Sequence, residues 1–288
     1  MLWGSQNTRS GAAAAPARAL TPLPASMDLE FAQISDLGLV RTGNEDYFGS
    51  ALPETPERVR SHGWLFAVAD GVGGHDRGEV ASHLTIESVV DGFRGAMAGE
   101  SHSSLLNKLV VSANTKVIDA AHAASTNMAT TIVACALRYD RATVAHVGDS
   151  RCYLIRKGQA TQLTRDHTVV NDQFRLGVIS ASEMASSESK HVLSRSIGSE
   201  LMVKVDVGEH QVFAGDVLVL CSDGLHGSVT GGDMARILSG DVELNAAAKQ
   251  LVNLANERDG NDNITALIIR IRNVERVGMY RGRPYRLP

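Results

Sequence analysis

Most of the side chains in this sequence that could do chemistry are carboxylates, and they occur in short stretches that contain or adjoin glycine. These stretches are spread over most of the chain. The residues of interest are Arg41, Glu45, Asp46, Asp70, Asp149, Asp223 and Asp262. Most of the acids lie beside an apolar run that is typical of a β-strand. A fold that brings several strand ends together would therefore gather them into one acidic cluster with a cation beside it.

A cluster of carboxylates predicts a site for divalent cations. Like charges repel one another and are costly to remove from water, so acids are normally grouped in this way to hold metal ions. Oxygen ligands favour hard ions such as Mg²⁺ or Mn²⁺, whereas zinc prefers histidine and cysteine. Arg41 would then bind an anion lying on the metals, because guanidinium groups pair well with phosphate. Metal ions beside an anion-binding arginine indicate phosphate chemistry.

Two of the stretches share one design, in which an apolar strand ends in an Asp-Gly pair. Asp70 and Gly71 follow the run Trp64–Ala69, and Asp223 follows the run Val217–Cys221. Because glycine lets the backbone approach an ion closely, the Gly71 carbonyl could be a ligand beside the Asp70 carboxylate. A single Asp-Gly pair is a common turn signal. The metal prediction therefore depends on the whole set of stretches.

The composition fits an ordinary soluble protein with a substantial core. The chain has 288 residues, 43% of them hydrophobic, and a formal net charge of −4, which argues against non-specific binding to nucleic acid. The three cysteines, Cys135, Cys152 and Cys221, lack metal-ligand spacing, and we expect buried thiols in a reducing compartment. No apolar stretch approaches the roughly 18–20 residues of a membrane span. We therefore expect a cytoplasmic protein with no nucleic-acid partner and no membrane span.

The chain is expected to consist of one domain between two tails. Residues 1–26 contain seven alanines, three prolines and no acid, which predicts a disordered N-terminal tail. An acid-free start would also suit an organelle transit peptide. Residues 27–272 form the expected catalytic domain, and no proline occurs between Pro56 and Pro284. Residues 273–288 are basic, and we expect a solvated C-terminal tail.

The spacing of apolar residues predicts both strands and helices. Seven runs rich in valine and isoleucine are expected strands: Glu30–Ile34, Trp64–Ala69, Thr130–Leu137, Thr143–Val147, Cys152–Arg156, Val217–Cys221 and Ile264–Ile271. Helical spacing occurs within residues 80–97, 105–118 and 244–254. The polar segment Thr164–Gly198 is expected to be a mobile flap near the site, with a short helix over Val169–Gly177. This order favours antiparallel sheets flanked by helices over a repeating βαβ array.

Taken together, the stretches resemble the metal-dependent protein phosphatases of the type 2C family, in their compact bacterial form. The resemblance runs from about Ile34 to Arg270. It is carried by R-T-G-N-E-D from Arg41, D-G-V-G-G-H from Asp70, G-E-V-A-S from Gly78, A-T-T-I-V from Ala129, H-V-G-D-S-R from His146, L-T-R-D-H from Leu163, L-S-R-S-I-G from Leu193, S-D-G-L from Ser222 and D-N-I-T from Asp262. Agreement at this many ordered positions is very specific.

The resemblance implies an α+β fold. Its centre would be a β-sandwich of two antiparallel sheets flanked by helices on both faces, with the metals in a cleft at one end. The expected strands are compatible with this architecture, although they would not establish its topology alone.

The resemblance also implies a role for each acid in holding cations. Asp70 would bridge two Mn²⁺ or Mg²⁺ ions, with the Gly71 carbonyl on one of them. Asp223 and Asp262 would bind the other ion. Asp149, together with Asp223, would hold a third and weaker ion. Two such cations lower the pKa of a shared water until hydroxide exists near neutral pH, and this hydroxide would attack phosphorus in line.

The remaining site residues would act on water and phosphate. Glu45 and Asp46 would hold metal-bound waters, and Arg41 would bind the phosphate oxygens and neutralise developing charge. Some eukaryotic relatives have a histidine as general acid two residues after the bridging aspartate, and here Val72 occupies that position. We expect His75 only to cap or orient the following helix. A water on the third ion, near Asp149, is then the expected proton source.

The implied function is hydrolysis of phosphoserine and phosphothreonine on proteins by a metal-activated water. The enzyme would oppose a cognate serine/threonine kinase in signalling, and we expect a monomer. A metal-dependent phosphatase of a small metabolite is an alternative, because the motifs recognise phosphate and not its carrier. A non-catalytic phosphoprotein-binding relative would be expected to lack some of Asp70, Asp223 and Asp262, and all three are present. A P-loop kinase or ATPase is excluded, because no Gly-Lys pair occurs.

The spacing gives no ligand role to the other histidines, among them His167 and His191. Arg165 and Arg195 adjoin matched motifs, which leaves contact with substrate open for both.

Overall fold

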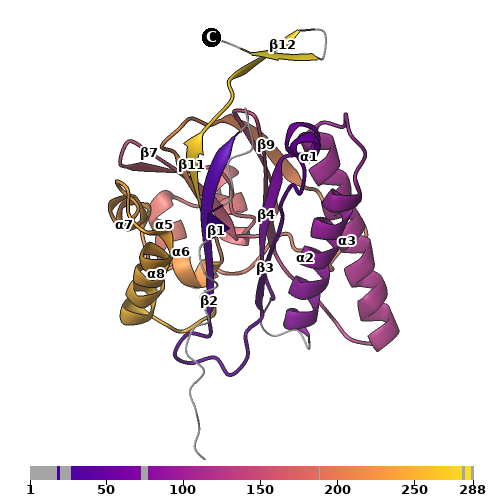
Figure 1. Cartoon of the computed structure of the whole chain (residues 1–288). Coiled ribbons are helices and arrows are strands. Elements are labelled where there is room, and N and C mark those ends of the chain that lie inside the picture. The colour runs from indigo at the N-terminus through magenta and orange to yellow at the C-terminus, as the bar shows by residue number, and fades with distance from the viewer. Residues whose placement is uncertain (1–17, 20–26, 73–76, 188, 281–282, 287–288) are drawn as a thin grey trace, which may run out of the picture.

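A computed structural model of the chain describes residues 18–19, 27–72, 77–187, 189–280 and 283–286. Most of the expected N-terminal tail and His75 lie outside these residues. Within them, two antiparallel sheets pack face to face, and helices cover both outer faces (Figure 1). This is the β-sandwich that the family resemblance implied.

In the first sheet, strands from near the start of the chain lie beside a strand from near its end. Its strand order is β1 (Arg18–Ala19), β2 (Asp28–Asp36), β11 (Ile264–Asn273), β10 (Val217–Cys221), β7 (Arg151–Arg156) and β8 (Gln159–Gln162). Every neighbouring pair is antiparallel. Side chains alternate between faces along each strand, so Val219 packs beneath the outer helices while Leu218 and Leu220 enter the core between the sheets.

The second sheet carries the other half of the core. Its order is β3 (Asp46–Ala51), β4 (Trp64–Asp70), β5 (Ile132–Arg138), β6 (Arg141–Val147) and β9 (Asp206–Gln211). Its strands are also antiparallel throughout. Phe66 and Val68 of β4 face the first sheet, whereas Leu65 and Ala67 face the outer helices. Both faces of β4 are therefore buried, which explains its uninterrupted apolar sequence.

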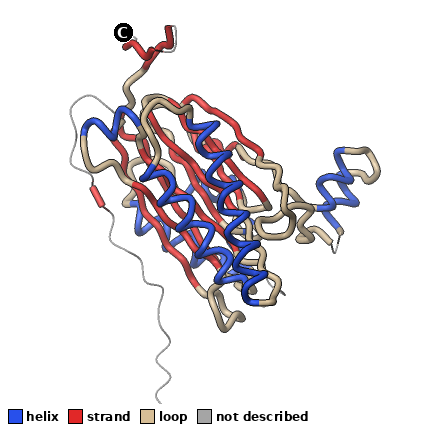
Figure 2. Tube along the Cα trace, turned by 90° about the vertical axis from the view of Figure 1, so that its right-hand side faces the viewer, coloured by secondary structure: helices blue, strands red, loops and turns tan. Residues whose placement is uncertain are grey.

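Helices cover each sheet according to their apolar stripes. The long helices α2 (Gly78–Gly95) and α3 (His102–Ala124) pack on the second sheet. The first sheet is covered by α6 (Asp223–His226), α7 (Gly231–Ile237) and α8 (Leu244–Arg258). The short helix α1 spans Pro56–Ser61, and α4 (Val169–Arg175) and α5 (Ala181–Ser186) lie within the expected flap. In Figure 2, a helical part of the chain stands away from the sandwich.

The expected elements are present, with strand ends that differ by at most two residues. The sequence missed β3, β8 and β9, and it missed the helices α1, α5, α6 and α7. The three strands all lie at sheet edges, where one side of the ladder is unpaired and polar residues are tolerated. They consequently lack the apolar runs by which strands are recognised.

Two segments differ from the tails that we expected. Arg18–Ala19 pairs with Glu30 and Phe31 at the edge of the first sheet. At the other end, β12 (Val277–Tyr280) and β13 (Arg283–Arg286) form an antiparallel hairpin, which stands above the sandwich in Figure 1.

The start of β4, the strand that delivers Asp70, generates a testable prediction. Gly63 has a φ of +69°, and a Cβ there would lie 1.9 Å from the Leu137 carbonyl oxygen. Gly158 has a similar φ of +76°, but a Cβ added to Gly158 would have no atom within 4 Å. Gly158→Ala should lower the free energy of unfolding by about 1–2 kcal/mol through backbone strain alone. Gly63→Ala should lower it by at least about 3 kcal/mol, because the clash is added.

Urea unfolding of both variants measures this difference. Equal losses would show that the clash at Gly63 is relieved without cost.

Candidate metal centre

The predicted acids converge at one end of the sandwich. Asp46 opens β3 and Asp70 closes β4, while Asp149 lies in the connection between β6 and β7. From the first sheet, Asp223 follows β10 and Asp262 precedes β11. A cavity of about 470 Å³ is lined by Arg41, Asp70, Gly71, Asp149, Asp223 and Asp262, together with residues of the flap. The structure thus brings together residues that are more than 200 positions apart in the sequence.

Asp46 is held beside Asp70 by the pairing of β3 with β4. The two residues are direct cross-strand neighbours. One Asp46 oxygen, Oδ2, accepts a 2.6 Å hydrogen bond from the Ser222 hydroxyl. The other oxygen, Oδ1, is buried and has no hydrogen-bond partner within the described part of the chain. A buried carboxylate oxygen without a donor fits a site for a cation or its bound water.

The carboxylates raise one another's pKa. Burial, followed by the charges of Asp46, Asp223 and Asp149, raises the pKa of Asp70 well above its usual range. Burial likewise raises the pKa of Asp46 to about 7, against the lowering effect of the hydrogen bond from Ser222. Burial and the charge of Asp223 raise the pKa of Asp149 to about 7. Full ionisation of this cluster is therefore unfavourable unless positive charge is supplied, so the oxygen donors fit divalent cations.

Asp223 differs from its neighbours. Burial alone would raise its pKa, but the neighbouring imidazoles of His191 and His226 lower it on balance. His191 Nδ1 lies 3.7 Å from Asp223 Oδ2. His191 comes from the flap, so this contact places the flap against the acidic cluster. Its spacing in the sequence gave no indication of that position.

Arg41 lies at the edge of the cavity with its side chain 39% exposed. Its Nη2 donates a 2.7 Å hydrogen bond to Asp262 Oδ2, and this bond is the main reason that the pKa of Arg41 is raised. Asp262 Oδ1 accepts from the Asn263 amide. The predicted phosphate-binding group is therefore at the site, where it is paired with a predicted metal ligand.

Two residues without a predicted role hold the acidic loops in place. Asn263 Oδ1 accepts from the Glu45 amide at 2.8 Å, and its Nδ2 donates to the carbonyls of Leu37 and Gly43. Thr131 Oγ1 accepts from the Asp70 amide at 3.0 Å. Both belong to motifs that carried the family resemblance, which was the only sequence signal for them.

The backbone around Gly71 is close to the start of α2. The Gly71 amide donates to the Glu45 carbonyl at 3.0 Å. A Cβ at this position would lie 2.5 Å from backbone atoms of Gly78. Only glycine therefore fits between the acidic loop and α2 without displacing one of them.

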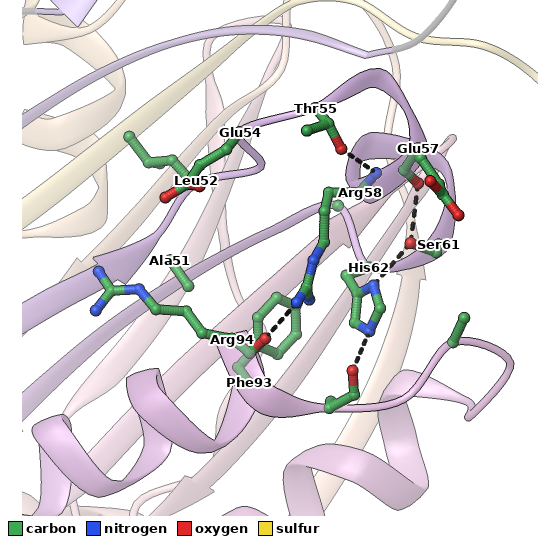
Figure 3. Close-up of a pocket in the computed structure, with 13 residues that line it drawn as sticks. Ala51, Leu52, Glu54, Thr55, Glu57, Arg58, Ser61, His62, Phe93 and Arg94 are labelled. Atoms are coloured by element: carbon green, nitrogen blue, oxygen red, sulfur yellow. Dashed lines mark hydrogen bonds between the residues drawn. The ribbon is translucent and has the colours of Figure 1, made fainter.

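A second cavity, of about 490 Å³, lies at the opposite end of β3 and has a different character (Figure 3). It is lined by Ala51, the last residue of that strand, and by residues of α1 and the end of α2. Arg58 donates to the Arg94 carbonyl at 2.6 Å, and Arg94 donates to the Ser50 carbonyl at 3.1 Å. None of the clustered aspartates lines it, so it is separate from the candidate metal centre.

Other chemistry in the described residues is limited. All three cysteines are free and buried, and burial raises the pKa of Cys135 and Cys221 to about 12. They are therefore unsuited to act as thiolate nucleophiles.

None of the helices in the described ranges combines the length and apolar character needed to cross a membrane.

Comparisons with known proteins agree with this geometry. The family model for protein phosphatase 2C matches residues 43–267. A serine/threonine phosphatase of Listeria innocua is 33% identical over 254 residues, which cover 86% of this chain and 96% of the relative. The structure of the Streptococcus agalactiae serine/threonine phosphatase has a TM-score of 0.75 and 32% identity, covering 84% of this chain and 99% of that one.

A further solved structure contains metal ions. The catalytic domain of the serine/threonine protein phosphatase PstP, in complex with two manganese ions, has a TM-score of 0.72 and 31% identity. The match covers 86% of this chain and all of that chain.

The raised pKa values predict a pH-dependent response to metal. A carboxyl whose pKa is higher in the folded than in the unfolded protein binds more protons when folded, so its contribution to stability falls as pH rises from about 4 to about 7. The melting temperature of the metal-free protein should therefore be lowered by Asp46 and Asp149 towards neutral pH. Adding Mn²⁺ should raise it more at pH 8 than at pH 5.5, by roughly 5–10 °C more.

Calorimetry at both pH values, with and without Mn²⁺, measures this difference, and comparison at a single pH cancels the titration of unrelated groups. Asp46→Asn should reduce the difference between the Mn²⁺ responses at the two pH values. An equal Mn²⁺ response at both pH values would contradict the electrostatic account.

Proposed function

The chain belongs to the protein phosphatase 2C family, and we propose that it hydrolyses phosphoserine and phosphothreonine in proteins with the help of divalent cations. The observation that carries this proposal is the convergence of Asp70, Asp149, Asp223 and Asp262 on one cavity. The relatives named as serine/threonine phosphatases support the reaction and the substrate class. The manganese complex of a relative supports dependence on divalent metal.

Asp70 is the proposed bridging ligand, because the charges of the surrounding aspartates all act on it. We assign the Gly71 carbonyl to one Mn²⁺ or Mg²⁺ ion and Asp223 and Asp262 to the other. Asp149 would hold a third, weaker ion with Asp223. Bound cations would supply positive charge for the phosphate and make a water acidic enough to serve as nucleophile near neutral pH.

The remaining residues would orient the reactants. The unpartnered oxygen of Asp46 and the half-buried carboxylate of Glu45 would accept hydrogen bonds from water at the site. Arg41 would turn from Asp262 towards phosphate oxygens, because a guanidinium binds them with charge-assisted hydrogen bonds. Its exposed position at the rim leaves room for that movement.

The surroundings of the site favour a protein substrate over a small metabolite. A third cavity, of about 440 Å³, shares Asp149 and His191 with the cavity of the candidate metal centre and continues between the flap and the first sheet. An extended surface of this kind suits residues on either side of a phosphoserine, whereas a metabolite is usually enclosed. A phosphorylated protein substrate requires a serine/threonine kinase, and this enzyme would oppose that kinase in signalling. It would do so as a monomer in the cytoplasm.

Phosphate release from a phosphothreonine peptide tests the proposal. With Mn²⁺, kcat/KM for the peptide should exceed that for sugar and nucleotide monophosphates, and EDTA should abolish turnover until Mn²⁺ is restored. Asp70→Asn should lower kcat by about 10³-fold or more, because charge stabilisation worth several kcal/mol is lost. Asp233→Asn is a control, since Asp233 pairs with Arg258 on the outer helices. Turnover that persists in chelator, or a preference for metabolites, would refute the proposal.

Variants of Arg41 separate its two contacts. If it binds phosphate, Arg41→Ala should raise KM by about 10–100-fold, the loss of a hydrogen bond between charged groups. Arg41→Lys should raise KM less, because the charge remains. If Arg41 instead only holds Asp262, the Mn²⁺ concentration for half-maximal activity should rise while KM at saturating Mn²⁺ stays unchanged. Steady-state kinetics at several Mn²⁺ concentrations distinguishes these results.

A further inference from the structure

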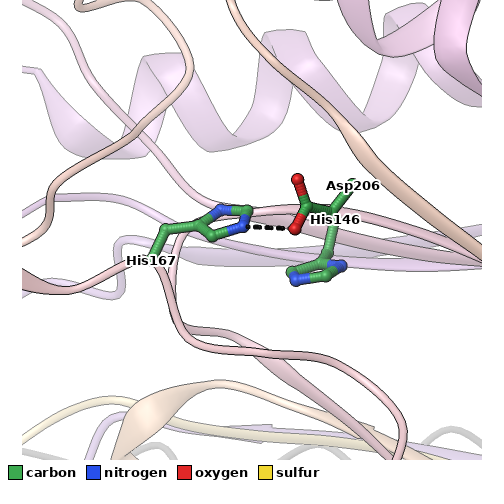
Figure 4. Close-up of side chains that lie close together, drawn as sticks. All are labelled: His146, His167 and Asp206. Carbon is green, nitrogen blue, oxygen red and sulfur yellow. Dashed lines mark ion pairs between the residues drawn. The ribbon is translucent and has the colours of Figure 1, made fainter. Parts of the chain in front are cut away.

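One carboxylate beside the metal centre holds both ends of the flap, here defined as residues 164–198. Asp206 opens β9 and is the cross-strand partner of His146 in β6. Arg165, at the start of the flap, donates to Asp206 Oδ2 at 3.1 Å. Arg195, at its end, donates to Asp206 Oδ1 at 2.9 Å. His167 Nε2 lies 3.2 Å from Oδ2, and Figure 4 shows this ring facing the carboxylate, with His146 also close to Asp206.

His167 links this carboxylate to the loop that carries Asp149. Its side chain is fully buried. Its Nδ1 accepts a 3.1 Å hydrogen bond from the Gly148 amide, and its own amide donates to the Gly148 carbonyl at 2.9 Å. Its carbonyl accepts from the Ser194 amide at 2.9 Å, which ties it to the end of the flap. One residue therefore contacts the loop before Asp149 and both ends of the flap.

The bond from Gly148 determines the tautomer of His167. Because Nδ1 accepts from an amide, the ring proton must be on Nε2, where it can be donated to Asp206. Arg195 Nη1 also lies 3.2 Å from Nε2. A hydrogen bond from Arg195 to Nε2 would require the ring proton to be on Nδ1, where it would face the N–H of Gly148. Burial lowers the pKa of His167 to about 4, so the ring is neutral. Its two nitrogens thus have distinct and fixed partners.

The same cluster has the ligand types of a transition-metal site, but its contacts argue against one. The ligand atoms of His146, His167 and Asp206 lie within 4.8 Å of one another. However, two guanidinium groups already donate to Asp206, and their charge would repel a cation. His146 Nε2 is occupied by backbone atoms of Arg165, at 2.9 Å from the oxygen and 3.2 Å from the nitrogen. These contacts make the cluster a hydrogen-bond network within the protein.

We propose that Asp206 and His167 are positioning residues, which fasten both ends of the flap to the Asp149 loop and so set the flap against the metal centre. The inference rests on the proposed phosphatase function for its kinetic consequences. The flap supplies His191, Val192 and Leu193 to the wall of the catalytic cavity. Loosening the Asp206 contacts should therefore weaken binding of a phosphopeptide. Loosening the Gly148 contact should instead disturb the position of Asp149.

Two substitutions of His167 separate the contacts. In His167→Asn, the amide oxygen replaces Nδ1 and can still accept from Gly148, but nothing reaches Asp206. In His167→Gln, the amide nitrogen replaces Nε2 and can still donate to Asp206, but the Gly148 amide loses its acceptor. Asp206→Asn keeps the shape of the side chain and removes its charge. Asp233→Asn is the matched control, since Asp233 also accepts from two arginines, Arg236 and Arg258.

Hydrogen–deuterium exchange of the metal-free protein provides a readout that does not depend on activity. In Asp206→Asn and His167→Asn, flap amides should exchange about tenfold faster or more, as expected for the loss of a charge-assisted hydrogen bond. In His167→Gln, the acceleration should instead occur at residues 146–150. Asp233→Asn should leave both segments unchanged. Uniform acceleration over the whole chain in every His167 and Asp206 variant would reduce these residues to a general structural role and overturn the proposal.

Kinetics supplies the second readout. Asp206→Asn and His167→Asn should raise KM for a phosphothreonine peptide by about tenfold, with kcat for a small aryl phosphate nearly unchanged. His167→Gln should raise the Mn²⁺ concentration needed for half-maximal activity. Equal losses of kcat on both substrates, or a bound transition metal that Asp206→Asn removes, would overturn the proposal. If the wild-type protein lacks phosphatase activity, the proposed function fails, while the exchange pattern still tests the positioning role.

If Asp206→Asn does not fold, Arg195→Gln removes the Asp206 contact at the end of the flap and should accelerate exchange there.

Discussion

Repulsion between carboxylates that are held close together and partly out of water is the constraint on which the site depends. Asp46, Asp70 and Asp149 all have raised pKa values because burial and neighbouring charge disfavour their ionised forms. The apolar side chains packed between the sheets carry no charge, so they cannot offset this repulsion. The acids are held in place by backbone and side-chain hydrogen bonds. A pair of cations would neutralise the negative charge that these bonds leave uncompensated.

The acids lie close together because the strands that carry them end at the same end of the sandwich. Each acid lies at or just beyond the limit of a strand, where the backbone leaves the hydrogen-bonded ladder, and four of the aspartates line the cavity. The ladders are rigid, so they place these ends accurately. Short polar contacts complete the arrangement, such as those from Ser222 to Asp46 and from Asn263 to the Glu45 loop.

The sequence predicts the parts of this structure that are marked by local pattern. The buried strands, the long helices and the acids at strand ends are all recognisable, because apolar periodicity and Asp-Gly pairs are local signals. The edge strands β8 and β9 are too polar to be recognised in this way. The positions of His191 and Asp206 could not be predicted, because they depend on how the flap folds back on the sandwich. Such contacts are determined by tertiary packing, for which residue spacing carries no signal.

The central place of β11 in the first sheet makes one segment of the chain necessary for both the sheet and the site. This strand lies between β2 and β10, and Asp262 lies two residues before it. A chain cut before residue 262 would lose the strand that joins these two neighbours, and with it one of the acids. Loss of this segment would therefore divide the first sheet and leave the candidate metal centre incomplete at the same time.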